Sequence, residues 1–373
     1  FKKMKKILYF FKNDIVLTAA LILAVVSCFI IPPNAGYMDY IDFNTLIMLF
    51  CLMLIVEGLR RQNVFLYVGS RLLKQVRSPQ GVALVLVFLC FFASMYITND
   101  VSLITFVPFG LLMMEMTGMT KKAGLIVVLM TIAANLGSMF TPIGNPQNIY
   151  LFSLSGMAIG DFLLLMLPYT AVSAALLLLC IFIGCRGGAV RAEEMKKESV
   201  DPKQIWPYIV LFILCLVTVS GLFNHWLLLV VVAVGIFWKD RRLFGRIDYS
   251  LLLTFVFFFV FTGNINGMPQ LREWLISMIS GRETQISIAA SQVISNVPAA
   301  MLLSAYTDDI PALIVGTNLG GLGTLIASMA SLISYKQMAV RFPQTKKRYI
   351  LLFTVLNVVF LAVLWLFYAV LRP

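Results

Sequence analysis

Long apolar segments alternate with short polar ones along almost the whole chain. A helix needs about 20 apolar residues to cross the hydrocarbon core of a bilayer, which is about 30 Å thick. Segments such as 227–237 and 251–261 are apolar on every face, whereas the strands of a membrane barrel alternate. We therefore predict helical crossings at residues 15–31, 43–59, 123–154, 162–183, 206–222, 226–238, 251–264, 310–334 and 349–371.

Two further segments are predicted to enter the membrane as hairpins and return to the same side. The first covers about residues 81–117, where two apolar halves, each shorter than a full span, flank Thr98, Asn99 and Asp100. The second covers about residues 284–306 and turns at Ser295 and Asn296. Such non-helical turns are tolerated at membrane depth only where protein buries them or they line a water-filled cavity. Segments 63–76 and 268–280 mix charged and apolar residues, which fits helices lying along the inner and outer surfaces.

Two crossings are interrupted by Gly and Pro, so we predict broken helices at about residues 122–155 and 309–335. Pro cannot donate a helical hydrogen bond, and Gly opens left-handed conformations. The polar and Gly residues in or beside the two breaks are Asn135, Gly137, Thr141, Gly144, Asn145, Gln147, Asn148, Asn318, Gly320, Thr324 and Ser328.

The composition agrees with a membrane protein. Hydrophobic residues make up 60% of the 373 positions and charged residues 12%, against about 25% charged residues in soluble domains. With a cytoplasmic N-terminus, the basic residues in the gaps, including 2–12 and 186–203, face the cytoplasm. All but three of the 29 basic residues then lie inside, the exceptions being Arg272, Arg282 and Arg372. The positive-inside rule thus favours a multi-pass protein of the cell (inner) membrane, with an outer C-terminus and the lipid bilayer, not nucleic acid, as its partner.

The two halves of the chain repeat polar and Gly positions in the same order. Residues 41–46 correspond to 247–252, residues 97–100 to 294–297, and the sequence Asn-Leu-Gly occurs at 135–137 and at 318–320. Because 206–222 adds one crossing, the repeats are predicted to be inverted, as in many secondary transporters. The predicted organisation is a first repeat at 1–184, a cytoplasmic linker at 185–205, and a linking helix with the second repeat at 206–373.

The two hairpin turns and the two breaks are the candidate binding site. Free backbone N–H groups at helix starts suit anions, while freed carbonyls and side-chain oxygens suit Na⁺. Asp100 is the one carboxylate expected deep in the membrane, where charge is costly and points to function; the alternative is an N-cap for a helix starting at Val101. Na⁺ could bind at Asn99, Asp100 and Asn296.

The other polar residues have simpler interpretations. Glu57 and Glu115 are expected to pair with basic residues at the inner surface, and Asp308 and Asp309 to cap the helix that follows them. His225, the one histidine, is expected in a short outer loop. The six cysteines lie in apolar segments without metal or disulfide spacing.

The sequence contains no Walker sequence, no GxGxxG turn after a strand, no HExxH and no GxSxG. We therefore expect neither an enzyme nor an ATP-driven pump, and no cofactor besides Na⁺ or H⁺ as a coupling ion. No Arg or Lys is expected at mid-membrane depth, so an anionic substrate would depend on backbone N–H groups, Asn side chains and hydroxyl groups.

These residues resemble the ion transporter superfamily, which joins arsenite-efflux pumps, D-type sodium–proton antiporters, citrate transporters and divalent-anion:sodium symporters. The resemblance covers residues 15–371 and is strongest at the hairpin turns and at 143–148. The symporters are similar at Ser-Asn-Thr turns, but both turns here lack the final Thr. What the resemblance implies is a homodimer in which a transport domain holding both hairpins and both broken helices moves against a fixed scaffold.

Three functions remain open at this point. The first is a carrier of a small oxyanion or carboxylate, coupled to Na⁺ or H⁺ and working by an elevator motion. The second is a Na⁺/H⁺ antiporter that uses Asp100. The third is a channel or a membrane protein that transports nothing.

Overall fold

The computed structural model describes residues 15–74, 76–187 and 200–371, which form 17 α-helices, five short 3-10 helices and no strand. Eight helical segments in these ranges are long and apolar enough to cross a membrane. The prediction of an all-α polytopic membrane protein is therefore confirmed. The basic stretch at 2–12, the linker centre at 188–199 and Arg372 lie outside the described residues.

The helices of the first half of the chain are α2 (Ile15–Ile30), α3 (Phe43–Arg61), α4 (Val64–Leu73), α5 (Pro79–Ile97), α6 (Asn99–Met116), α7 (Ala123–Ser138), α8 (Pro146–Ser155) and α9 (Ile159–Gly184). Those of the second half are α10 (Pro202–Val219), α11 (His225–Asp240), α12 (Tyr249–Asn266), α13 (Pro269–Ile279), α14 (Glu283–Ile294), α15 (Asn296–Leu303), α16 (Ile310–Leu319), α17 (Met329–Arg341) and α18 (Lys346–Leu371). The 3-10 helices are η1 (Ala35–Tyr40), η2 (Thr120–Lys122), η3 (Arg241–Gly245), η4 (Ser304–Tyr306) and η5 (Pro343–Thr345).

Short polar side chains start several of these helices. The Asp42 carboxylate accepts a hydrogen bond from the Thr45 backbone N–H at 3.1 Å, and Asp248 accepts one from Leu251 at 3.1 Å. Each cap satisfies one of the free donors at a helix start. Asp309 likewise accepts from the backbone of Ala312 at 2.9 Å, which confirms the predicted cap of α16.

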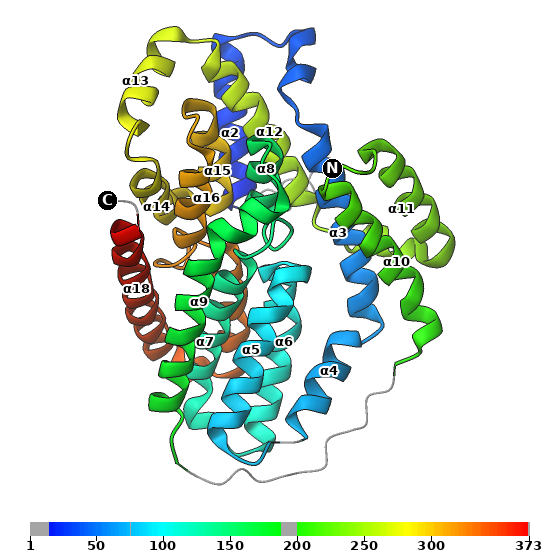
Figure 1. Ribbon diagram of the computed structural model, residues 1–373, viewed down its shortest axis with the longest axis vertical. Helices are drawn as coiled ribbons and strands as arrows, with labels where there is room; N and C mark the ends of the chain where they lie inside the picture. The colour runs from blue at the N-terminus through cyan, green and yellow to red at the C-terminus, as the bar shows by residue number, and fades with distance from the viewer. Residues whose placement is uncertain (1–14, 75, 188–199, 372–373) are drawn as a thin grey trace, which may run out of the picture.

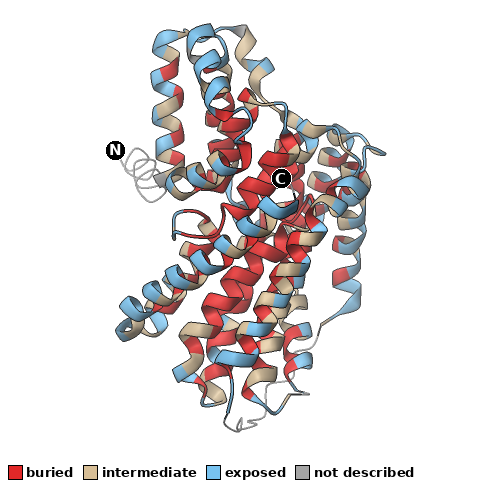
Figure 2. Ribbon diagram, turned by 60° about the vertical axis from the view of Figure 1, so that its left-hand side comes forward, coloured by how far each residue is buried: buried red, intermediate tan, exposed pale blue. Residues whose placement is uncertain are grey.

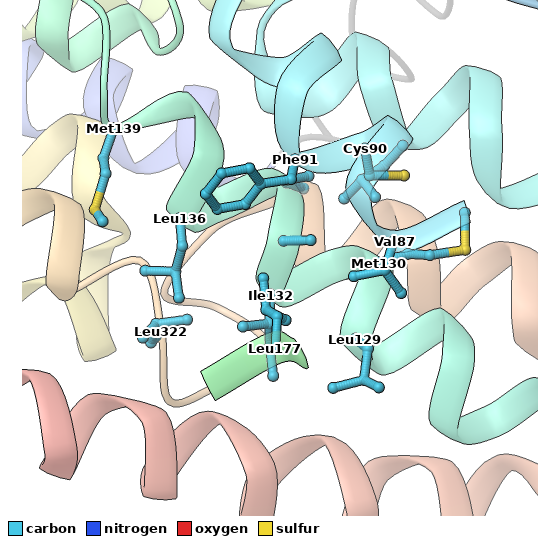
Figure 3. Close-up of a cluster of buried hydrophobic side chains, with 14 of the residues drawn as sticks. Val87, Cys90, Phe91, Leu129, Met130, Ile132, Leu136, Met139, Leu177 and Leu322 are labelled. Carbon is cyan, nitrogen blue, oxygen red and sulfur yellow. The ribbon is translucent and has the colours of Figure 1, made fainter. Parts of the chain in front are cut away.

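The buried apolar side chains form two clusters. The first, which we call the α7 cluster, surrounds α7 and draws side chains from α5, α6, α9 and α16 to α18; Figure 3 shows part of it, where Leu136 and Met130 lie among residues of neighbouring elements. The second, the α3 cluster, joins α3 to α10, α11 and α12, and includes Ile143, Ile149 and Met301. Figure 2 shows buried residues along the middle of the molecule and exposed ones on its outer helices. Many of those outer residues are large and apolar, as a lipid-facing surface requires.

Close packing in the α7 cluster depends on a glycine. A Cβ atom on Gly137 would lie 2.0 Å from the Phe91 carbonyl oxygen, so only glycine allows α7 to approach α5 this closely.

Two helical hairpins and two interrupted helices lie at the centre. Helices α5 and α6 turn at Thr98, and α14 and α15 turn at Ser295. Residues 139–145 separate α7 from α8, and residues 320–328 separate α16 from α17. Figure 1 shows α5 and α6 in the lower half of the view and α14 to α16 in the upper half, an arrangement that inverted repeats would produce; the repeat relationship itself stays a prediction.

The first hairpin is longer than the sequence pattern predicts. Helices α5 and α6 have 19 and 18 residues, and each is long enough to cross a membrane, so the expectation of two short halves is wrong. Helix α5 gains its first turn from the Ser78 cap and Pro79, and α6 continues through the polar residues Asn99 to Ser102. Apolar pattern alone does not mark either extension.

Candidate functional site

Both hairpins turn through one residue with a positive φ angle. Thr98 has φ 68° and ψ 154°, and Ser295 has φ 74° and ψ 154°. The next residues, Asn99 and Asn296, begin α6 and α15, and neither helix start is capped by a side chain of its N-cap residue. Each hairpin therefore presents a helix N-terminus at its turn.

Asn135, in the last turn of α7, joins the first hairpin to the second break. Its Oδ1 atom accepts hydrogen bonds from Asn99 Nδ2 at 3.0 Å and from Ser328 Oγ at 3.0 Å. Its Nδ2 atom donates to the Gly321 carbonyl at 3.4 Å and to Ser331 Oγ at 3.5 Å. All four side-chain contacts of Asn135 thus lie outside its own helix.

Asn318, in the last turn of α16, makes the corresponding contacts with the first break. Asn145 Nδ2 donates to Asn318 Oδ1 at 3.2 Å, and Asn318 Nδ2 donates to Asn148 Oδ1 at 2.7 Å. Each of the two Asn-Leu-Gly sequences therefore contributes an asparagine that binds the break of the other half.

The second hairpin turn joins the same network through the backbone. Asn296 N–H donates to the Ala327 carbonyl at 3.0 Å, and the Asn296 amide lies against Gly321, whose Cβ, if present, would be 3.1 Å from Asn296 Nδ2. Both turns and both breaks consequently meet in one region, although Asn99 and Asn296 share no direct hydrogen bond.

Two polar atoms in this region have no partner within the described ranges. Asn145 Oδ1 and Gln147 Nε2 are buried, with 2% and 1% of each residue exposed, and no described group hydrogen-bonds to either. A buried polar group left unpaired costs about 1–3 kcal/mol. One free acceptor and one free donor, two residues apart at the start of α8, are therefore suited to a bound solute.

Asp100 does not have the alternative role predicted for it, that of an N-cap residue. It is the second residue of α6 and does not cap a helix at Val101; its own N–H donates to Asn99 Oδ1 at 2.8 Å. The helix starts two residues earlier because Thr98 makes the turn. Among the described residues, the Asp100 carboxylate has no hydrogen-bond or ion-pair partner.

A cavity of about 140 Å³ opens beside Asp100, which we call the charged cavity. It lies between α3, the first hairpin and the start of α12. The charged residues that line it are Glu57, Arg60, Asp100, Arg246 and Asp248. The sequence indicated only Asp100, because the arginines belong to segments that it places at the inner surface.

The two predicted ion-pair carboxylates are both paired. Glu57 contacts Arg60 at 2.9 Å and Arg246 at 3.6 Å, and Glu115 accepts from Arg341 Nε at 2.7 Å. The pair of Glu115 and Arg341 ties α6 to α17. The predicted pairing is confirmed, whereas the position of both pairs at the inner surface stays a prediction. Glu57 is also largely buried in the wall of the charged cavity.

Several other candidate residues have packing or turn roles in the structure. A Cβ on Gly144 would lie 2.0 Å from the Ser138 carbonyl oxygen, and one on Gly320 would lie 2.6 Å from Ser291 Oγ, as with Gly137 against α5. The Thr141 hydroxyl donates to the Met95 carbonyl.

The second break is held by Gln292, which the sequence analysis did not single out. Its Nε2 donates to the carbonyls of Gly320 and Leu322 at 3.0 and 2.9 Å, and its Oε1 accepts from Thr324 N–H at 2.9 Å. Thr324 itself is exposed. Half of the residues of α14 are polar and Gln285 is a second glutamine, so the sequence offered no clear signal for Gln292.

A second cavity, of about 510 Å³, lies further along α8, toward its C-terminal end, and we call it the neutral cavity. Its lining includes Asn44, Ser153 and His225, and no Lys, Arg, Asp or Glu. His225 is the first residue of α11, so its predicted loop position is wrong; Asn224 caps the helix one residue earlier.

The donor set suits Na⁺ better than a transition metal. The described residues contain no group of three or more His, Cys, Asp or Glu side chains that could hold a metal ion. Amide, hydroxyl and carbonyl oxygens, with one carboxylate, are the ligands that hard cations prefer. Of the predicted Na⁺ ligands Asn99, Asp100 and Asn296, Asn99 Oδ1 already accepts from Asp100 N–H, and the Asn296 amide lies against Gly321. The Asp100 carboxylate, which has no bonded partner among the described residues, is the better ligand of the three.

Comparison with known proteins gives consistent matches over most of the chain. Residues 7–311 match the citrate transporter family. An uncharacterized transporter of Methanocaldococcus jannaschii is 33% identical over 79% of this chain and 81% of its own length, and inner membrane protein YbiR of Escherichia coli is 30% identical over 79% and 80%. The silicon efflux transporter LSI3 of rice is 28% identical over 42% of this chain and 32% of its own length.

Proposed function

This chain belongs to the citrate transporter family and is a secondary transporter rather than an enzyme, and we propose that it carries a small oxyanion or carboxylate together with Na⁺ or H⁺. The observation that supports this cargo is the pair of buried, unpartnered atoms at the start of α8. Gln147 Nε2 would donate to an anion oxygen, and Asn145 Oδ1 would accept from a protonated oxygen or bind a cation.

The surroundings of these atoms favour a small solute. The amides of Asn135, Asn148 and Asn318 are hydrogen-bonded to one another or to the backbone, so the bonded amides of both halves surround the two free atoms. Helix α8 directs its N-terminus toward the same region, and a helix N-terminus attracts negative charge. No Lys or Arg is hydrogen-bonded to this network in the described ranges, so the cargo would carry little charge or enter with a cation.

We also propose that the protein works as a homodimer by an elevator motion. The α7 cluster contains residues of both hairpins, while the α3 cluster is built mainly from α3, α10, α11 and α12. Two separate hydrophobic clusters are what a moving and a fixed part would need. The residues Ile143, Ile149 and Met301 would then form the sliding contact between them.

Flux through the purified protein in proteoliposomes tests the cargo. The labelled panel includes citrate and silicate, following the names of the family and of the rice relative, with phosphate and other small carboxylates. We expect one anion to accumulate only under a Na⁺ or pH gradient and to show counterflow. Gln147→Ala should abolish that flux, whereas Gln204→Ala, on an exposed part of α10, should not.

A Na⁺/H⁺ antiporter is the second candidate, since the Asp100 carboxylate faces a cavity without a bonded partner. If no anion moves but Na⁺ dissipates a pH gradient across the vesicles, the anion proposal fails and antiport replaces it. Flux of an anion without counterflow would instead indicate a channel.

A further inference from the structure

The charged cavity and the neutral cavity are separated by a thin apolar wall. Ile149, on α8, lines both cavities. On α3, Met48 lines the neutral cavity and its neighbour Leu49 lines the charged one. In the first break, Pro142 lines the neutral cavity and its neighbour Ile143 lines the charged one.

Adjacent residues on opposite sides make this wall about one side chain thick, because neighbouring Cα atoms are about 3.8 Å apart. Its members are tightly packed: Met48, Leu49, Ile143 and Ile149 are 2%, 3%, 3% and 4% exposed. An ion that crossed it would lose its hydration without gaining a polar partner, which is prohibitive. The wall is therefore a barrier to solutes in this conformation.

The charges of the two cavities place them toward opposite membrane faces. The charged cavity contains Arg60 and Arg246, from segments that the positive-inside rule assigns to the cytoplasm. The neutral cavity lies at the opposite end of α3, beside Asn44 and the α10–α11 turn, which the same rule assigns to the outside. Thr98 and Asp100 open on the charged cavity alone.

We propose that the two cavities are the inner and outer vestibules of one solute pathway between α3 and the first break, closed at Ile149. This inference rests on the proposed transport function. It further assigns the present conformation as open toward the cytoplasm, with the hairpin turn reached through the charged vestibule. The neutral vestibule would supply the same solute from outside after the wall rearranges.

Cysteine labelling tests the sidedness without measuring transport. Ser153, in the neutral cavity, and Tyr96, in the charged cavity, are both exposed. In a background with the six native cysteines replaced, Ser153→Cys should react with a membrane-impermeant maleimide on intact cells, and Tyr96→Cys only on inside-out vesicles. Reaction of both from the same face would overturn the proposal, whatever the protein transports.

Truncation of the wall provides an independent test. Ile149→Ala should raise the passive leak of small ions from proteoliposomes at least about tenfold, the effect of lowering a barrier by about 1.4 kcal/mol. Ile55→Ala removes the same atoms from a buried position on α3 that lines neither cavity and should leave the vesicles tight. Equal leak from the two variants would show that Ile149 closes no pathway. This leak does not depend on the identity of the cargo, so the proposal of two vestibules can be contradicted while the proposed cargo stands, and the reverse.

Discussion

Thr98 and Ser295 adopt the same rare backbone conformation at the turns of the two hairpins, with φ/ψ of 68°/154° and 74°/154°. Positive φ is uncommon outside glycine and is least favourable for a β-branched residue such as Thr98. Such strain costs of the order of 1–3 kcal/mol and persists where the surrounding structure enforces it. The sequence comparison of the two halves pairs these same two residues, so the strained turn occurs once in each half.

Replacing Thr98 by glycine should relieve this strain. Glycine adopts positive φ freely, and Thr98 makes no side-chain cap hydrogen bond that would be lost. We expect Thr98→Gly to stabilise the detergent-solubilised protein by roughly 1 kcal/mol, after the entropic cost of glycine, measured as a higher thermal unfolding midpoint.

Thr105→Gly is the matched control for this strain. Thr105 is buried in the middle of α6, and its hydroxyl has no partner in the described ranges. Glycine there should lower the free energy of unfolding by roughly 0.3 kcal/mol from helix propensity. The cavity left by the buried side chain adds to that loss, so the unfolding midpoint should fall. If Thr98→Gly and Thr105→Gly lower the unfolding midpoint by the same amount, the turn at Thr98 stores no strain.

Asn135 should be the most sensitive amide of the candidate site. Asn135→Ala leaves Asn99 Nδ2 and Ser328 Oγ without their acceptor, at a cost of about 1–3 kcal/mol for each buried group. We expect a lower unfolding midpoint and no measurable flux. Asn357→Ala serves as control, since Asn357 is fully buried but donates only to Phe353 within its own helix; it should keep its flux. Normal transport by Asn135→Ala would remove Asn135 from the site.

Adding a methyl group should have opposite effects on stability at two glycines of α7. In Gly137→Ala the new Cβ would meet the Phe91 carbonyl oxygen at 2.0 Å, whereas nothing lies within 4 Å of a Cβ at Gly124. We expect Gly137→Ala to destabilise the protein by about 1–3 kcal/mol through overpacking, and Gly124→Ala to leave it unchanged or up to about 1 kcal/mol more stable. Thermal unfolding of both purified variants measures the difference; similar midpoints would contradict the close approach of α5 and α7.

Asp100 should be required for coupling but not for folding. Its carboxylate has no bonded partner in the described part of the chain, so Asp100→Asn leaves no group unpaired. We expect normal expression and an unchanged unfolding midpoint, with loss of the dependence of flux on a Na⁺ or pH gradient. Asp308→Asn, at an exposed position, should behave as the wild type. Gradient-dependent flux that survives in Asp100→Asn would exclude this carboxylate from the mechanism.

Hydropathy and charge were sufficient to predict the helical membrane fold, because lipid forces apolar spans and leaves basic residues in the gaps. They failed at helix ends, where local hydrogen bonding decides. Helix α6 begins at Asn99 since Thr98 takes the whole turn, and α11 begins at His225 because Asn224 caps it. Neither decision is visible in an apolar pattern.

The candidate site was predictable as a list of residues but not as a geometry. Asn-Leu-Gly repeats indicated that Asn135 and Asn318 correspond, yet not that each binds the opposite break. Partners as distant as Asn145 and Asn318, 173 positions apart, cannot be paired from one sequence. The arginines of the charged cavity were missed for the same reason, since Arg246 meets Glu57 only through the fold.

The exchange of hydrogen bonds by Asn135 and Asn318 has a mechanical consequence. Each asparagine is anchored in one half of the chain and holds the interrupted helix of the other. A shift of either break would therefore displace the other as well, so the two breaks would move together as one rigid unit. Substitution of one asparagine should then make both breaks less rigid. A compensating substitution would have to arise in the other half of the sequence.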